Sequence, residues 1–121
     1  MKILVCEDDF MMLKTIEHKL LREGYEVELA QDGKIAFELL RENQYDFVIT
    51  DLLMPYSTGL EIIDLIRNQL KQTIPIIVLS KVGMEKTVLQ AFDMGTDDYI
   101  VKPFSPNELS MRIKRLIASG R

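Results

Sequence analysis

The sequence lacks three features that would each indicate a particular class of protein: a second cysteine, a long apolar run and a block of basic residues. Its one cysteine, Cys6, lies in a short apolar run, so we interpret it as a buried hydrophobic residue without an intrachain disulfide. No apolar run approaches the roughly 18 residues that cross a membrane. The net charge is -4 and Lys114–Arg115 is only a mild basic cluster, which argues against direct nucleic-acid binding.

A secretory signal is also missing, because Met1 and Lys2 lead directly into a short apolar run that is followed by acids. The 121 residues, 47% of them apolar and 28% charged, are enough for one hydrophobic core and have an ordinary globular composition. We therefore expect residues 1–121 to form a single cytoplasmic domain that makes no membrane contact.

Short apolar runs alternate with amphipathic segments five times along the chain. The apolar runs predict strands at residues 2–6, 25–30, 47–50, 74–79 and 99–101. The segments between and after them have helical apolar spacing, and the predicted helices begin near residues 9, 32, 59, 84 and 106. Five such units predict an α/β fold with helices on both faces of a parallel sheet. A closed barrel needs eight units, so we expect an open sheet.

Helix N-caps are indicated at two of these boundaries. Asp32 precedes an apolar-periodic segment and has a side chain that accepts hydrogen bonds from the first turn. Ser105 is followed by Pro106, and Glu108 stands three residues after the serine, which is the spacing of a capping box. The second and fifth helices therefore have clear predicted starting points.

Charged residues directly follow three of the predicted strands. Glu7 and Asp8 follow the first strand, Asp51 follows the third and Lys102 follows the fifth. The carboxyl ends of parallel strands meet at one edge, where ligands bind, so we expect an acidic pocket with a lysine beside it. Three carboxylates repel one another and need a proton or a divalent cation. Oxygen ligands favour Mg²⁺, and Mn²⁺ is able to substitute.

Each residue of this edge also has a purely structural interpretation. Asp9 has the position of an N-cap, and Asp51 is either a turn residue or a nucleophile that attacks a phosphoryl group. Lys102 is either a surface lysine or a partner of Asp51 and later of the phosphoryl group. Its neighbour Pro103 allows a cis bond that redirects the chain in a tight turn. Ser80 ends the fourth strand, where its hydroxyl would reach the same phosphoryl oxygen.

Four motifs together resemble the receiver domain of two-component response regulators. They are LVCEDD at residues 4–9, TDLLMP at 50–55, LS at 79–80 and YIVKPF at 99–104. The resemblance spans essentially the whole chain, with the motifs in the family's order. It implies an open doubly wound parallel sheet of order 2-1-3-4-5, flanked by five helices in the flavodoxin-like arrangement.

The resemblance also implies a phosphorylation chemistry. A histidine kinase would transfer a phosphoryl group to Asp51, while Mg²⁺ is bound by Asp8, Asp51 and the backbone carbonyl of Leu53. Glu7 would hold a water molecule of the metal. Lys102 takes the position that pairs with the phosphate in this family.

Two further positions correspond to the family's conformational switch, and one departs from its pattern. Ser80 takes the switch-hydroxyl position, and Tyr99 takes the position of an aromatic that turns inward when the hydroxyl moves. An ordinary edge-strand aromatic is the alternative for Tyr99. Lys81 stands where the family usually has a small residue, and a long cation there would restrict donor access or offer the phosphoryl group another partner. We expect it to alter the lifetime of the phosphorylated state.

The fourth helix, the fifth strand and the last helix correspond to the family's output face. Asp98, Glu108 and Arg112 resemble charges that pair across the dimer of winged-helix transcription-factor regulators, but the matching basic position is Val88. We therefore expect a monomer or a weak dimer. The implied partners are a sensor histidine kinase or phosphotransfer protein and an unknown downstream effector. The chain resembles a stand-alone receiver, and a piece of a longer regulator would have the same sequence.

Three other functions fit the residues less well. A phosphohydrolase of the haloacid-dehalogenase type has a second Asp two residues after its nucleophile, and here that residue is Leu53. A pseudo-receiver would not need the intact set of acids, hydroxyl and lysine. A nucleotide-binding fold would have a glycine-rich loop after its first strand instead of acids. We therefore predict a phosphorylation switch and not an enzyme with a separate substrate.

Overall fold

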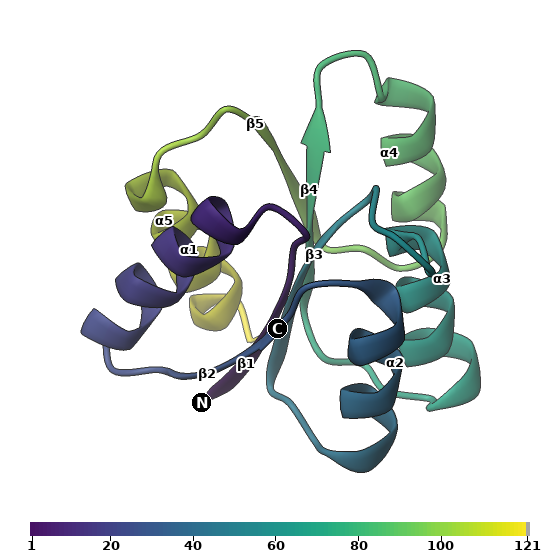
Figure 1. The fold of residues 1–121 in the computed structure, drawn as a ribbon, viewed down its shortest axis with the longest axis horizontal. Coiled ribbons are helices and arrows are strands. Elements are labelled where there is room, and N and C mark those ends of the chain that lie inside the picture. Colours follow the sequence, from purple (N-terminus) through teal and green to yellow (C-terminus); the bar gives the residue numbers. More distant parts are fainter. Residues whose placement is uncertain (121) are drawn as a thin grey trace.

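The computed structural model describes residues 1–120 as five parallel strands in the order β2-β1-β3-β4-β5. The strands are β1 (Lys2–Cys6), β2 (Glu26–Ala30), β3 (Phe47–Asp51), β4 (Ile76–Lys81) and β5 (Asp98–Lys102). The helices are α1 (Phe10–Arg22), α2 (Gly33–Glu42), α3 (Gly59–Asp64), α4 (Glu85–Asp93) and α5 (Pro106–Ala118). Figure 1 shows α1 and α5 on one face of the sheet and α2, α3 and α4 on the other. The predicted fold class and strand order are confirmed.

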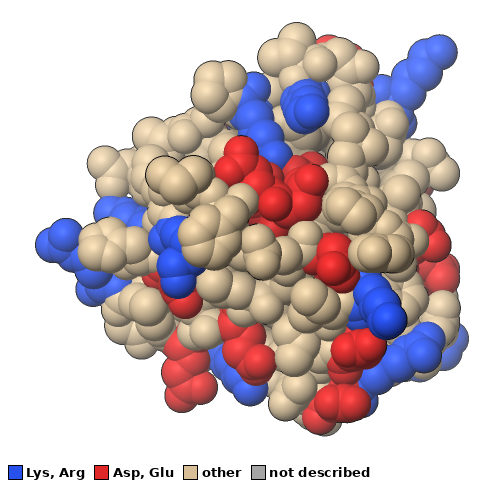
Figure 2. All heavy atoms as spheres, viewed as in Figure 1, with Lys and Arg blue, Asp and Glu red and all other residues tan. Residues whose placement is uncertain are grey.

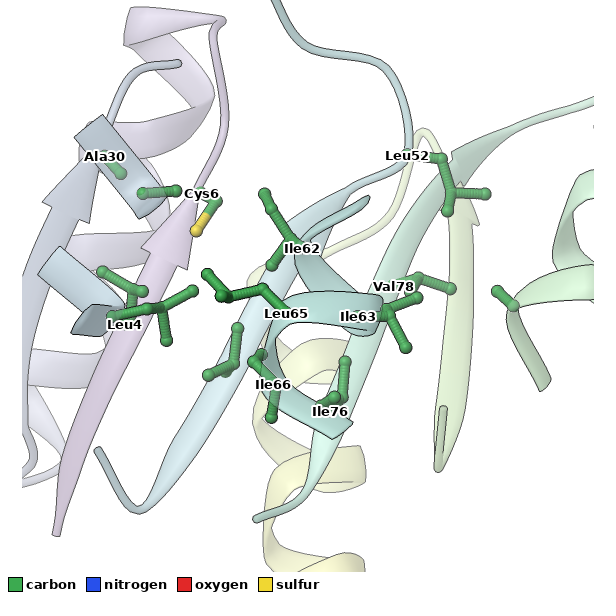
Figure 3. Close-up of a cluster of buried hydrophobic side chains, with 14 of the residues drawn as sticks. Leu4, Cys6, Ala30, Leu52, Ile62, Ile63, Leu65, Ile66, Ile76 and Val78 are labelled. Carbon is green, nitrogen blue, oxygen red and sulfur yellow. The ribbon is translucent and has the colours of Figure 1, made fainter. Parts of the chain in front are cut away.

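The sheet is covered on both faces, so its central strands are apolar over most of their length and become polar at their carboxyl ends. One core lies between the sheet and α1 and α5, and includes Ile3, Val5, Leu13, Ile16, Ile49, Ile77, Leu79, Ile100 and Ile113. The other lies against α2, α3 and α4, and includes Leu4, Cys6, Leu52, Ile62, Ile63, Leu65, Ile76 and Val78 (Figure 3). The predicted burial of Cys6 is confirmed, and burial raises the pKa of its thiol to about 12.

The strand register shows on which face of the sheet each side chain at the carboxyl edge lies. Successive side chains of a strand alternate between faces, and paired residues of neighbouring strands share a face. Asp51 is paired with Leu79, which belongs to the core beside α1 and α5. Lys81 and Lys102 are paired with each other, two residues beyond members of that same core. Ser80, between Leu79 and Lys81, therefore belongs to the α4 face.

The N-caps predicted at Asp32 and Ser105 are present, and the cap at Thr58 was not anticipated. Asp32 accepts a hydrogen bond from the Ile35 amide at 2.9 Å, and Ser105 accepts one from the Glu108 amide at 3.1 Å. At the start of α3, Thr58 and Glu61 form a complete capping box. None of the helices within residues 1–120 has the length and apolar character needed to cross a bilayer.

The fourth strand was predicted two residues too early, because β4 runs from Ile76 to Lys81. Pro75 therefore precedes the strand, and its carbonyl accepts a hydrogen bond from the Val48 amide at 3.0 Å. The Asp97 carboxylate accepts a hydrogen bond from the Ile76 amide at 2.8 Å, and the Asp97 amide donates to the Ile76 carbonyl. Contacts with a residue far along the chain thus set where β4 begins.

The third helix also differs from the prediction, since it continues from α3 into a π-helical segment, η1 (Leu65–Gln69). The Leu70 amide donates to the Leu65 carbonyl at 2.8 Å, five residues back. Arg67 of this segment donates to the Gly95 carbonyl at 3.1 and 2.9 Å and to the Gln72 carbonyl at 3.0 Å. These contacts join the wider turn to the α4–β5 loop and to the segment before β4.

Gly59 allows the start of α3 to lie directly against the end of β3. A Cβ atom at this position would lie 2.4 Å from the Asp51 carbonyl oxygen and 2.8 Å from the Leu52 Cα. These neighbours are backbone atoms and have no room to move aside. The Gly59 amide donates to the Leu52 carbonyl at 3.0 Å, which fixes the approach.

Replacing Gly59 with alanine should displace the loop after Asp51 and lower the free energy of unfolding by about 1–3 kcal/mol, as overpacking typically does. Gly24→Ala is the matched control, because Gly24 has φ +91 but open space around it. That control should lose roughly 1–2 kcal/mol through backbone conformation alone. Amide resonances of residues 51–53 should shift in Gly59→Ala and stay in place in Gly24→Ala. Unshifted resonances in both variants would contradict the close contact.

Candidate functional site

A polar pocket lies at the carboxyl edge of the sheet, where the sequence predicted it. Figure 2 shows acidic side chains gathered there with basic side chains at their border. The cavity has a volume of about 310 Å³ and is lined by Glu7, Asp8, Asp9, Met12, Asp51, Leu53, Lys81 and Lys102. It combines the residues that follow β1 with the last residues of β3, β4 and β5.

Lys102 connects two buried carboxylates in this pocket. Its ammonium group donates to both carboxylate oxygens of Glu7, at 2.9 and 3.1 Å, and to Oδ2 of Asp51. Glu7 is fully buried and Asp51 is 3% exposed, so neither carboxylate is well solvated. The Lys102–Pro103 peptide bond is cis, as the sequence allowed.

The pKa values of this group reflect its crowding. Burial raises the pKa of the Glu7 carboxyl to about 8, and the adjacent Asp51 carboxyl adds to the shift against the opposing effect of Lys102. Burial alone would lower the pKa of Lys102, but its contacts with Asp51 and Glu7 outweigh burial and raise it. The pocket therefore favours a positive charge, whether as a proton, the ammonium group or a cation.

The carboxylates are close enough to bind one metal ion. Glu7, Asp8 and Asp51 each offer an oxygen, and these oxygens lie within 4.8 Å of one another. A set of oxygen donors fits a hard divalent cation such as Mg²⁺. Asp9 has a different role, because it caps α1 and accepts a hydrogen bond from the Met12 amide at 3.2 Å.

The position of Asp51 is fixed by the backbone around it. It is the last residue of β3, and its Oδ1 accepts a hydrogen bond from the Leu53 amide at 3.1 Å. The Leu52 amide donates to the Leu79 carbonyl at 3.1 Å, so the chain stays paired with β4 just beyond the carboxylate. Leu53 itself is exposed at the mouth of the pocket.

The two switch candidates lie on the other face of the sheet, toward α4. Ser80 is 1% exposed, and its hydroxyl is one of two buried side-chain groups within residues 1–120 that have no hydrogen-bond partner. Tyr99 is 39% exposed and packs edge-on against Phe92, with ring centroids 5.7 Å apart. A groove of about 410 Å³ between α4 and β5 contains Ser80, Val88, Phe92 and Tyr99 in its lining.

The charged candidates of the output face pair with one another within the chain. Arg112 donates to Asp98 at 3.0 Å and to Glu108 at 3.2 Å, and Arg115 donates to Asp98 at 2.8 Å. Val88 is 7% exposed and belongs to the core on the α4 face of the sheet. Each of these residues therefore has an internal structural role.

Sequence reasoning did not single out Phe92 or Arg115. Phe92 stands four residues after Val88, so helical spacing placed both on one face of α4. Arg115 stands three residues after Arg112, and the same rule placed the two cations on one face of α5. The helical spacing was visible in the sequence, but the contacts of Phe92 and Arg115 with β5 residues are known only from the structure.

Lys102→Met should destabilise the domain, because it leaves two buried carboxylates without their cation. We expect a loss of about 1.5–3 kcal/mol, as for hydrogen bonds to charged groups, in thermal or urea unfolding with chelator present. Added Mg²⁺ should restore part of the loss by supplying positive charge. Lys114→Met is the control, since it removes the same charge from a largely exposed lysine. Equal stability of the two variants in chelator would contradict this account.

Comparison with known proteins agrees with the geometry. The family model described as response regulator receiver domain matches residues 3–114. The transcriptional regulatory protein ResD of Bacillus subtilis is 41% identical over 116 residues, which are 96% of this chain and 48% of ResD. The transcriptional regulatory protein SrrA of Staphylococcus aureus is 39% identical over 116 residues, 96% of this chain and 47% of SrrA. The chain spans about half the length of these curated relatives.

Solved structures give the same result. The receiver domain of the Francisella response regulator 1452 superposes with a TM-score of 0.89 at 33% identity, covering 99% of this chain and 98% of that one. The two folds therefore agree over nearly the whole length of both chains. With a family match over residues 3–114 and relatives that align along 96% of its length, the chain belongs to the response regulator receiver domains of two-component signalling.

Proposed function

We propose that residues 1–121 act as one cytoplasmic phosphorylation switch, in which Asp51 accepts a phosphoryl group from the phosphohistidine of a sensor kinase or phosphotransfer protein. The observation that carries the proposal is the position of the Asp51 carboxylate. It lies at the carboxyl end of β3, in contact with Lys102 and within metal-ligand range of Glu7 and Asp8. A carboxylate with a cation on one side and acids on the other is arranged for phosphoryl transfer.

The transfer itself requires little movement of the protein. An oxygen of Asp51 attacks phosphorus as the bond between phosphorus and the donor imidazole nitrogen breaks, and the nitrogen keeps the electron pair. Oδ1 of Asp51 is already held by the Leu53 amide, which limits its rotation. Lys102 then transfers its contact from Oδ2 to a phosphoryl oxygen, so its charge offsets the charge that arrives.

Asp8, Asp51 and the backbone carbonyl of Leu53 are the proposed ligands of Mg²⁺, with Glu7 binding a metal water. A cation held by these residues would offset the charge of the phosphoryl oxygens and reduce the repulsion among the carboxylates. Mn²⁺ has the same preference for oxygen and should replace it. Glu7 remains tied to Lys102 throughout, which keeps the lysine directed at Asp51.

Receiver domains of this family belong to signalling proteins, and we propose that this one has no separate substrate. It catalyses its own phosphorylation and slow dephosphorylation only. Leu53 stands where a fast phosphohydrolase of this type would have its general acid, and an alkyl side chain cannot activate water. The phosphorylated state would therefore persist long enough to be read by a partner.

Intact-mass analysis after treatment with acetyl phosphate and Mg²⁺ should show a single phosphate adduct. The adduct should disappear in Asp51→Asn and in the presence of chelator, because both the nucleophile and the cation are needed. Asp93→Asn, at an exposed position in α4, is the matched control and should be phosphorylated like the wild type. An adduct on Asp51→Asn, or none on the wild type, would show that the proposal is wrong.

We further propose that Ser80 and Tyr99 transmit the phosphorylation to the α4-β5-α5 face. The unpaired Ser80 hydroxyl would move to donate to a phosphoryl oxygen, and its movement would open room in the groove beside α4. The Tyr99 ring, now at the surface of that groove, would turn into the space. Val88 lines the groove, and Asp98, Glu108 and Arg112, which lie in β5 and α5, complete the proposed face that would present the change to an effector. Since the three charged residues pair internally, we propose a monomer or at most a weak dimer.

Ser80→Ala should remove this response while leaving the phosphorylation site intact. Beryllofluoride added to the wild type should shift the ring resonances of Tyr99, because the ring changes its surroundings. In Ser80→Ala the Asp51 region should still respond to beryllofluoride, but the Tyr99 shift should be lost or strongly reduced. Ser119→Ala is a control, since that serine lies at the distant end of α5. A full Tyr99 response in Ser80→Ala would exclude the hydroxyl as the trigger.

A further inference from the structure

Lys81 is the last residue of β4 and lies beside Lys102 in the sheet. The two lysines are paired in register, so their side chains leave the sheet on the same face. This face is also that of Asp51, which is paired with Leu79 two residues before Lys81. Hydrogen-bonded strand structure extends to Lys81 itself, so its backbone is held by the ladder and is not part of the following turn.

The two lysines differ in their contacts. Lys102 donates to Glu7 and Asp51 and is committed to both carboxylates. Lys81 is exposed and lines the same pocket, yet within residues 1–120 its ammonium group has no hydrogen bond or ion pair. A lysine next to several carboxylates would ordinarily pair with one of them. Lys102 contacts Glu7 and Asp51, and neither Asp8 nor Asp9 of the same pocket pairs with Lys81, which leaves the second ammonium free for a new anion.

Phosphorylation would supply that anion. The carboxylate of Asp51 has a charge of -1, whereas an acyl phosphate on the same oxygen has a charge near -2 and three strong acceptor oxygens. The pocket therefore becomes more negative at the moment when new acceptors appear within it. A positive charge already at the rim gains attraction in the phosphorylated state that it lacks at rest.

We propose that Lys81 is a second phosphoryl-binding lysine, which contacts the phosphoryl group from the β4 side while Lys102 contacts it from the β5 side. The inference rests on the proposed phosphorylation of Asp51. It has two consequences of opposite sign. Before phosphorylation, the extra positive charge opposes the binding of a divalent cation to Glu7, Asp8 and Asp51. After phosphorylation, the same charge attracts the phosphoryl group. Lys81 therefore weakens the binding of the metal ion alone and strengthens the binding of the phosphoryl group.

The test compares Lys81→Met, which keeps most of the length of the side chain and removes its charge, with Lys81→Arg, which keeps the charge. Lys71→Met is the matched control, because Lys71 is exposed in the loop before β4, at the opposite end of the sheet. Two affinities are measured for each protein. Mn²⁺ binding to the unmodified domain is followed by electron paramagnetic resonance, and beryllofluoride binding is titrated at saturating Mg²⁺.

Lys81→Met should bind Mn²⁺ more tightly and beryllofluoride about fivefold more weakly, the latter being the ratio expected for one pair of unit charges about 4 Å apart in water. Lys81→Arg should resemble the wild type in both measurements, and Lys71→Met should leave both unchanged. A purely structural effect of residue 81 would weaken both kinds of binding together. Opposite changes therefore identify an electrostatic contact with the phosphoryl position.

Unchanged beryllofluoride affinity in Lys81→Met would overturn the role of Lys81. Increased affinity would overturn it as well, and would show that the lysine restricts access to the pocket. In both cases the wild type would still take one phosphate on Asp51, so the proposed function would stand. If the wild type bound neither beryllofluoride nor phosphate, the proposed function would fall, and the role of Lys81 with it.

Discussion

The contact of one ammonium group with two buried carboxylates determines the arrangement of the whole pocket. Lys102 belongs to β5, Asp51 to β3, and Glu7 directly follows β1, so a single cation joins the ends of three strands. Buried carboxylates are costly unless they are paired, and within residues 1–120 Lys102 is the lysine that contacts both. Three other features help to bring these groups together: the alignment of the strand ends, the close contact of Gly59 with the end of β3, and the Asp9 cap of α1.

The positions of the acidic groups follow from simple rules of sequence. Buried strands read as apolar runs, and ligands collect at their carboxyl ends, so Glu7, Asp8, Asp51 and Lys102 were expected at one edge. The structure places all four in one pocket. The caps at Asp32 and Ser105 were equally readable, because a cap depends only on residues within one turn. Local chemistry and a single topological rule therefore account for most of the fold.

Features that depend on distant contacts were not readable. The first residue of β4 is set by Asp97, which lies 21 residues further along the chain. The π-helical turn at Leu65–Gln69 has the same apolar spacing as an α-helix, and its Arg67 contacts reach the α4–β5 loop. The groove beside Tyr99 exists because α4 and β5 pack at a particular separation. No pattern within a single segment contains that information.

The alternation of β4 has a consequence for how this sequence is able to change. Ser80 and Lys81 are neighbours in the chain, but Ser80 is buried on the α4 face, whereas Lys81 is exposed and lines the acidic pocket as well as the groove. A slip of β4 by one residue would reverse the faces of the two side chains, burying an ammonium group on the α4 face and removing the hydroxyl from it. The hydrogen bonds between Asp97 and Ile76, at the other end of the strand, therefore help to fix the register of β4 and the faces on which Ser80 and Lys81 lie. Insertions and deletions should be tolerated in the loops on either side of β4, but not within the strand.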